Sequence, residues 1–243
     1  MKKTLRKPFA GIRFDAPPLV GTFERRYKRF FADVRLDDGT LITAHCPNTG
    51  SLAGCKEEGR PAWLRDSGDP KRKLRFTWQA IRIGRGWVNV DTSLPNRVAA
   101  AAVEAGAIPE LEGYANLRRE VKYGENSRID LFLSEGERPD CYVEVKSTTL
   151  ADKRVARFPD AVTERGRKHL NELAKVASQG KRAVQFFLIS RGDVDVFRPA
   201  DDIDPAYGEA LRRAVDAGVE PIAWTTRVRP RSFELKDPVP IEL

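Results

Sequence analysis

The chain has 243 residues, of which 41% are hydrophobic and 32% are charged. This balance is typical of globular domains that bury apolar cores. The longest apolar runs, such as 98–103 and 184–189, are too short to cross a bilayer, and no apolar segment of a secretory signal follows the basic N-terminus. Three cysteines are few and odd in number, which favours a reducing compartment. We therefore expect a cytoplasmic protein that does not enter a membrane.

The positive charge is distributed unevenly along the chain. Lys and Arg number 43 against 35 Asp and Glu, a net charge of +8, and a basic surface attracts polyanions such as nucleic acids. A basic protein without such a partner is the competing interpretation. Much of the charge lies in about the first eighty residues, in two groups: Arg25, Arg26, Lys28, Arg29, and Arg60, Arg65, Lys71, Arg72, Lys73, Arg75. We predict that the first group contacts DNA.

Residues 1–90 are predicted to form a small β-barrel. Residues 29–36 alternate between apolar and polar side chains, a turn follows at Asp37-Asp38-Gly39, and residues 40–46 return with the same period, as in a β-hairpin. The run 74–80 repeats the period of two. Several short strands in a basic segment of this length favour an OB-like barrel, although the period alone also fits another small β-barrel.

From Pro95 onward, helical and strand patterns alternate. Asn96 is expected to cap a short Ala-rich helix that ends near Gly106. Two further helices are predicted, one from Asp160 or Thr163 to Gln179 and one from Asp204-Pro205 to Gly218. The predicted strands are 117–123, 128–133, 141–147, 183–190 with a continuation at 195–198, and 220–226. This order predicts an α/β domain with a mixed sheet in residues 91–243, and an α+β protein overall.

Two neighbouring predicted strands carry the clearest chemical pattern. Side chains alternate between the faces of a strand. Asp130 therefore points away from the apolar face of its strand, and Glu144 and Lys146 point away from the apolar face of the next strand. If the strands pair on one core, the three side chains converge. Two carboxylates suit a hard cation such as Mg²⁺ or Mn²⁺, with the carbonyl of Val145 as a further ligand, and Lys146 would then assist phosphodiester hydrolysis. Unrelated charges on an exposed strand face are the competing interpretation.

Asp130 with Glu144-Val145-Lys146 resembles the PD-(D/E)xK nuclease motif, and the wider sequence resembles the sugar fermentation stimulation protein family (SfsA). The resemblance covers nearly the whole chain, and its matching segments are 45–51, 108–111, 127–130, 142–147, 158–163 and 168–170. It implies an OB-like N-terminal domain followed by a PD-(D/E)xK nuclease-like domain. It also implies DNA binding, a historical link to the control of sugar-catabolism genes, and nuclease activity.

The resemblance extends the predicted site. Nucleases of this superfamily often carry a further acid upstream, for which Glu120 is the first candidate and Glu104 or Glu110 the alternatives. The helix after the second motif strand borders the site in this superfamily, so phosphate contacts are implied there, with a solvated helix face as the competing interpretation. The predicted catalytic residues are Asp130, Glu144, Lys146 and Glu120, and the predicted nucleic-acid contacts beyond the N-terminal cluster are Arg128, Arg165 and Lys168. His169 is not expected to ligate a hard cation.

Other motifs favour no further chemistry. The segment 47–51 is rich in turn-forming residues, and a structural turn is favoured over a phosphate-binding loop. His45, Cys46 and Cys55 lack a fourth ligand at zinc-site spacing. Gly84-Arg85-Gly86 is not a Walker loop, so no nucleotide cofactor is expected.

Three functional hypotheses follow. The first is a divalent-metal-dependent nuclease acting on DNA, with RNA as a further polymer. The second is a DNA-binding regulator that does not cleave, although such a protein needs no paired acids near phosphate, and no helix-turn-helix pattern is evident in the N-terminal part. The third, a carbohydrate-binding module, rests on the family name and on four tryptophans that core packing explains equally well.

Overall fold

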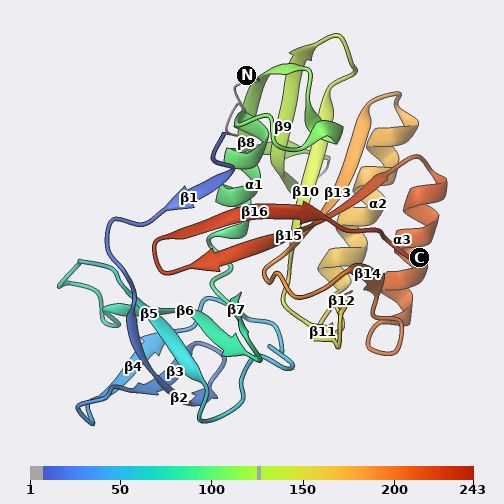
Figure 1. The fold of residues 1–243 in the computed structure, drawn as a ribbon. Coiled ribbons are helices and arrows are strands. Elements are labelled where there is room, and N and C mark those ends of the chain that lie inside the picture. Colours follow the sequence, from blue (N-terminus) through green and yellow to red (C-terminus); the bar gives the residue numbers. More distant parts are fainter. Residues whose placement is uncertain (1–7, 125–126) are drawn as a thin grey trace, which may run out of the picture.

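The computed structural model describes residues 8–124 and 127–243, so residues 1–7 of the expected first domain lie outside the described residues. The barrel occupies one end of the molecule and a larger sheet with helices on both faces forms the rest (Figure 1). The barrel sheet has the order β4-β3-β2-β5-β6-β7, and a pairing of β4 with β6 closes five of these strands. Its strands are β2 (Leu19–Tyr27), β3 (Phe31–Arg35), β4 (Leu41–His45), β5 (Pro61–Asp66), β6 (Phe76–Ile83) and β7 (Gly86–Asn89). The prediction of an OB-like barrel is confirmed.

The period of two places the core of this barrel. On the predicted hairpin, now β3 and β4, Ala32, Val34 and Ala44 are fully buried. Trp78 on β6 stacks on Phe23 of β2, with ring centroids 4.7 Å apart. Side chains from strands on either side of β5 thus meet in one interior, as a closed sheet requires.

The second part contains a seven-stranded sheet of order β1-β16-β15-β13-β10-β9-β8. Its strands are β1 (Gly11–Arg13), β8 (Tyr114–Tyr123), β9 (Ser127–Gly136), β10 (Cys141–Thr148), β13 (Arg182–Ile189), β15 (Glu220–Arg229) and β16 (Ser232–Pro238). The central strands β10, β13 and β15 run parallel and their outer neighbours antiparallel, which confirms the predicted mixed sheet. Every residue of β13 is buried, because helices cover both faces.

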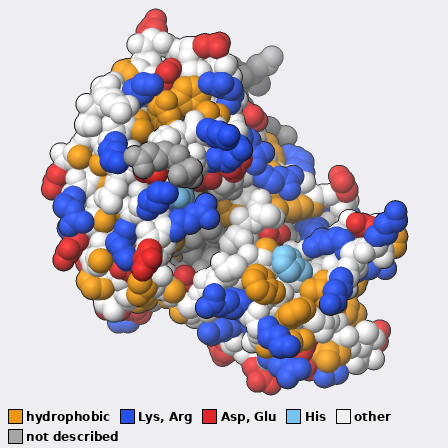
Figure 2. All heavy atoms as spheres, turned by 180° about the vertical axis from the view of Figure 1, so that it is seen from behind, with side chains coloured by type: hydrophobic (Ala, Val, Ile, Leu, Met, Phe, Trp, Pro, Cys, Tyr) orange, Lys and Arg blue, Asp and Glu red, His pale blue; other side chains and the backbone are white. Residues whose placement is uncertain are grey.

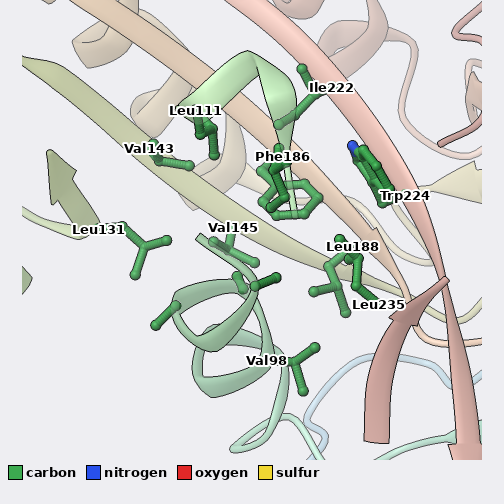
Figure 3. Close-up of a cluster of buried hydrophobic side chains, with 14 of the residues drawn as sticks. Val98, Leu111, Leu131, Val143, Val145, Phe186, Leu188, Ile222, Trp224 and Leu235 are labelled. Carbon is green, nitrogen blue, oxygen red and sulfur yellow. The ribbon is translucent and has the colours of Figure 1, made fainter. Parts of the chain in front are cut away.

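The helices divide the interior of this domain into two cores. α1 (Pro95–Glu104) covers one face of the sheet, and α2 (Glu164–Ser178) and α3 (Pro205–Asp216) cover the other (Figure 1). The core beneath α1 contains Val143 and Val145 of β10 together with Phe186 (Figure 3). Neighbouring residues of a strand face opposite ways. Glu144 and Lys146, which alternate with these valines along β10, therefore belong to the sheet face that α2 covers.

The helix starts follow from capping chemistry in two cases and from proline in the third. Thr163 accepts a hydrogen bond from the backbone N–H of Gly166 (3.0 Å), and Asp204 caps α3 in the same way. At α1 the prediction of an Asn96 cap is wrong. Pro95 occupies the first turn, where its fixed φ favours helix initiation, so the cap position is Leu94 and the side chain of Asn96 makes a different contact.

Two short strands also differ from the prediction. Residues 195–198 do not continue β13: β14 (Val196–Pro199) belongs to a separate three-stranded sheet with β11 (Ala151–Asp152) and β12 (Val155–Phe158). β1 pairs with β16 in the large sheet, so residues 11–13 lie with the second domain although the division at residue 90 assigned them to the first. Both pairings join distant segments that a local period does not reveal.

A single-turn 3-10 helix, η1 (Pro109–Leu111), precedes β8. In residues 8–124 and 127–243, no helix combines the length and the apolar character needed to cross a membrane.

Candidate active site

The two motif strands pair as predicted but separate at the site. β9 and β10 are antiparallel, and the last pair of their ladder is Leu131 with Val143. Beyond this pair the side chain of Asp130 takes the place of a backbone acceptor in the ladder: its Oδ2 accepts a hydrogen bond from the N–H of Val145 (2.7 Å). Its Oδ1 accepts from Nδ2 of Asn96 on α1 (2.6 Å). Asp130 is therefore held from two elements.

Glu144 is almost completely buried, with 3% of its surface exposed. Its Oε1 accepts hydrogen bonds from Nζ of Lys146 (2.6 Å) and from Nδ1 of His169 on α2. Its Oε2 is buried without a hydrogen-bond partner in the described part of the chain. A buried, unpartnered carboxylate oxygen is costly unless something else binds it, so this atom marks a candidate ligand position.

The helix α2 fixes the orientation of His169. Nε of Arg165 donates to Nε2 of His169 (3.3 Å), so this ring nitrogen is an acceptor. In the neutral imidazole the proton is then on Nδ1, which donates to Glu144. His169 thus occupies one oxygen of Glu144 and leaves the other free.

The pKa values of the two carboxylates are shifted in opposite directions. Burial, with the charge of Glu144 as a second cause, raises the pKa of Asp130 to about 7, and the Val145 N–H opposes this only in part. Burial also acts to raise the pKa of Glu144. The hydrogen bond from His169 and the charge of Lys146 outweigh it and hold that pKa below its ordinary value. Two carboxylates that repel each other, one of them with an unpartnered oxygen, form a candidate cation site.

Two cavities meet at these residues. A cavity of about 510 Å³, which we call the acidic cavity, is lined by Glu120, Ser127, Arg128, Asp130, Glu144, Arg165, Lys168 and His169. A larger cavity of about 900 Å³, which we call the interdomain cavity, lies between the barrel and the second domain. Asn96, Val145 and Lys146 line the interdomain cavity, and Arg165 lines both. The carboxylates therefore open to one cavity and the lysine to the other.

Of the three upstream acids considered, Glu120 alone lines a cavity beside Asp130. It lies across from Asp130 on β8, and its backbone carbonyl accepts a hydrogen bond from Arg128 (2.9 Å). Its φ of 54° is in the left-handed region, where a non-glycine residue is strained, and such strain often occurs at functional sites. Glu104 is exposed in the last turn of α1, and the carbonyl of Glu110 bonds Arg182 at the far end of the sheet.

The basic cluster of the barrel is divided between different roles. Arg26 donates to the carbonyls of Asn48 (2.7 Å) and Gly50 (2.9 Å), so it holds the loop 47–51. Arg25 pairs with Asp33 (2.8 Å). Arg26 and Arg29 line the interdomain cavity, whereas Arg25 and Lys28 line neither cavity.

The loop 47–51 connects the two domains as well as turning the chain. Asn48 Oδ1 accepts from the N–H of Gly50 (2.8 Å), which makes the turn. Oγ of Ser51 then donates to the carbonyl of Asp160 (2.6 Å), and the N–H of Leu52 donates to Oδ2 of the same residue (2.9 Å). The loop therefore fixes the barrel to the segment before α2.

Sequence reasoning missed the site roles of Asn96 and His169. The sequence pattern predicts a helix cap for Asn96, and for His169 it predicts a place on the helix face that borders the site, without metal ligation. His169 follows Arg165 by four residues, a spacing that places both on one helix face. Neither residue, however, could be linked to Asp130 or Glu144 before the helices were placed.

The residues present fit a cation that needs few protein ligands. The described residues contain no group of three or more His, Cys, Asp or Glu placed to hold a metal ion. Asp130 and Glu144 supply two carboxylates, one with an unpartnered oxygen. Mg²⁺ is commonly held by one or two carboxylates and keeps several water ligands, so the pair is sufficient for such an ion.

The fold and the candidate site define a two-domain protein in which an OB-like barrel precedes a mixed-sheet domain with a carboxylate pair and a lysine. The family model described as "SfsA N-terminal OB domain" matches residues 25–90, and that described as "Sugar fermentation stimulation protein RE domain" matches residues 93–232. The chain belongs to the sugar fermentation stimulation protein (SfsA) family.

Relatives of similar length support this assignment. The sugar fermentation stimulation protein homolog of Geobacter sulfurreducens is 50% identical over 225 residues, covering 93% of this chain and 96% of that protein. The homolog of Acidithiobacillus ferrooxidans is 52% identical over 227 residues, covering 93% and 98%. The solved structure of Pyrococcus furiosus SfsA in complex with Ca²⁺ has 29% identity and a TM-score of 0.87, covering 96% of this chain and 98% of that one.

Proposed function

We propose that this protein is a divalent-metal-dependent nuclease that hydrolyses phosphodiester bonds in DNA, with RNA as a further polymer. The observation that carries the proposal is the position of Glu144: it is buried beside Asp130 and Lys146, and its Oε2 has no partner in the described part of the chain. A buried carboxylate oxygen without a partner is costly, and a bound cation would remove this cost.

Asp130 and Glu144 are the residues that would hold Mg²⁺ or Mn²⁺, with the carbonyl of Val145 as the candidate third oxygen. Such an ion, when bound, neutralises charge on the scissile phosphate and lowers the pKa of water. The related Pyrococcus furiosus protein has been solved with Ca²⁺, a cation that also takes oxygen ligands.

The remaining residues of the site position these groups and stabilise charge. Asn96 and the Val145 N–H fix both oxygens of Asp130, and His169 fixes Oε1 of Glu144. Lys146 has 15% of its side chain exposed and lines the interdomain cavity. Its ammonium group is placed to stabilise the negative charge that develops as water attacks phosphorus. Glu120 is the candidate acid that supplements the pair.

The OB-like barrel and the net charge of +8 support nucleic acid as the partner, and we keep the cytoplasm as the proposed location. The alternative function, regulation of sugar-catabolism genes without cleavage, requires DNA binding but neither the buried carboxylates nor Lys146. The two functions therefore differ in whether the wild-type protein cuts.

Replacing Lys146 by alanine separates cleavage from binding. The lysine acts mainly in the transition state, so cleavage should fall by a factor on the order of 10² to 10³. DNA affinity measured in Ca²⁺, which prevents turnover, should change little. Lys175→Ala, in the last turn of α2, removes an equal charge away from the carboxylates and should retain activity.

The outcomes separate the hypotheses. Metal-dependent cleavage that is lost in Lys146→Ala supports the nuclease. Binding by the wild-type protein without cleavage of single-stranded DNA, duplex DNA or RNA in Mg²⁺ or Mn²⁺ contradicts it and favours the regulator. Equal cleavage by the wild type and Lys146→Ala would show a contaminating enzyme.

A further inference from the structure

The interdomain cavity is formed by both domains. The barrel contributes Arg26, Arg29, Lys56 and the loop 47–51, and the second domain contributes residues 157–165 and the end of β10. Lys and Arg side chains lie on both parts of the molecule around the hollow where these meet (Figure 2). A ligand in this cavity would therefore touch the barrel and the nuclease-like domain at once.

The lining is strongly cationic. Asp160 is the acidic residue in the lining, and its Oδ2 already accepts a hydrogen bond from the backbone N–H of Leu52. The cationic lining residues are Arg26, Arg29, Lys56, Lys146, Arg157 and Arg165. Lys146 and Arg157 are paired with the carboxylates of Glu144 and Asp202 outside the lining. Four lining cations therefore remain against one engaged carboxylate, and their positive potential in a cavity with low-dielectric walls attracts anions.

Two of these cations are not engaged elsewhere. Arg26 is bonded to loop carbonyls, Lys146 to Glu144, Arg157 to Asp202 and Arg165 to His169. Within residues 8–124 and 127–243, the side chains of Arg29 and Lys56 form neither an ion pair nor a hydrogen bond, and both residues are exposed. They are therefore available for an external anion.

The neutral lining groups suit a sugar-phosphate backbone rather than bases. Several lining hydroxyls are already engaged: Ser51 and Thr92 donate to the carbonyls of Asp160 and Pro47, and Ser147 bonds to Ser190. The hydroxyls of Thr49, Thr149 and Thr163 donate no hydrogen bond in the described part of the chain, and such groups commonly contact phosphate oxygens. The aromatic residue in the lining, Phe158, packs against Phe187 and Tyr207, with centroids 5.9 and 5.1 Å away. A ring packed in this way is a poor platform for a stacked base.

The cavity is also limited in size. Its volume of about 900 Å³ is in the range of pockets that enclose small ligands, which is enough for a short stretch of one strand. Ser51 of the loop 47–51 bonds to Asp160, so lining residues of the barrel and of the second domain are joined.

We propose that the interdomain cavity is a binding subsite for the phosphate backbone of a single nucleic-acid strand, next to the phosphate that is cleaved. The subsite rests on the proposed nuclease function for its position in catalysis, because Asn96, Val145 and Lys146 line the same cavity and Arg165 joins it to the acidic cavity. Arg29 and Lys56 are its specific anion contacts. Binding there is independent of base sequence.

The test replaces both contacts in the full chain, as Arg29→Glu with Lys56→Glu. Arg72→Glu with Lys73→Glu is the matched control, because these exposed cations of the same barrel line neither cavity. The affinity for fluorescent single-stranded oligo-thymidine and for a duplex of equal length is measured in Ca²⁺, over a range of salt concentrations. Arg29→Gln with Lys56→Gln repeats the test without charge reversal, and circular dichroism checks the fold of each variant.

We expect the first variant to lose at least tenfold in single-strand affinity and the control to lose much less. The slope of log affinity against log salt should fall by about 1.4, since each single-strand phosphate contact contributes about 0.7. Duplex affinity should change less than single-strand affinity. Equal losses in the first variant and the control, or a larger loss for duplex, would overturn the subsite.

This result is separate from the test of cleavage. If the wild type does not cleave but Arg29 and Lys56 prove necessary for single-strand binding, the subsite stands and the nuclease function fails. If cleavage depends on Lys146 but the charge-reversed variant binds as the wild type does, the nuclease function stands and the subsite fails.

Discussion

Replacing Asp130 by asparagine should change how the stability of the metal-free protein depends on pH. Burial raises the pKa of Asp130 from 3.8 to about 7 in the folded protein. Between these values the folded state holds a proton that the unfolded chain has released. The free energy of unfolding must then fall as the pH rises from about 4 to 7. This stability is present at low pH and is lost above the folded pKa.

The magnitude follows from the size of the shift. A change of about three pKa units corresponds to about 4 kcal/mol, of which about 3 kcal/mol falls between pH 4.5 and 8.5. Asparagine does not titrate, so the variant lacks this loss. Its amide must place Nδ2 toward either Val145 or Asn96, both of which now donate to Asp130, and we expect a pH-independent cost of about 1–3 kcal/mol.

Urea unfolding in EDTA at several pH values, followed by circular dichroism, measures the effect. The stability of Asp130→Asn minus that of the wild type should rise by about 3 kcal/mol between pH 4.5 and 8.5. Adding Mn²⁺ at pH 8.5 should stabilise the wild type and not the variant, because a ligand stabilises only the form that binds it. Parallel pH profiles for the two proteins would refute the argument from burial and repulsion.

Three further substitutions test other parts of the account. His169→Ala should lower the metal affinity measured by calorimetry by about 10–100-fold, because the carboxylate of Glu144 is then no longer held in orientation. His169→Asn restores one hydrogen-bond donor and should recover part of this affinity. Arg26→Ala should destabilise the barrel by about 1–3 kcal/mol in urea by freeing loop carbonyls, whereas Lys28→Ala should not. Phe186→Ala should cost about 3–5 kcal/mol by opening a cavity in the core beneath α1, and an unchanged thermal midpoint would contradict that packing.

The parts of the fold that depend on local periodicity were predictable. The hairpin of β3 and β4 follows from alternation, and the buried strand β13 follows from an apolar run that only Gln185 interrupts. The convergence of Asp130 with Glu144 and Lys146 was also accessible, because all three lie on adjacent strands joined by a short turn and side-chain parity decides their face.

The parts that depend on packing between distant segments were not predictable. Asn96 reaches Asp130 only because α1 lies across β9 and β10, and His169 reaches Glu144 only because α2 lies on the opposite face. The contact of Ser51 with Asp160 joins the two domains. Such contacts have no period in the sequence, since tertiary packing rather than local preference sets them.

Calorimetric titration of Mn²⁺ into the wild type and Asp130→Asn tests the central claim most directly. The account predicts binding to the wild-type protein that disappears in Asp130→Asn, where one carboxylate ligand is lost. Lys146→Ala keeps both carboxylates and should still bind. Unchanged Mn²⁺ binding in Asp130→Asn would place the metal elsewhere and contradict the proposed site.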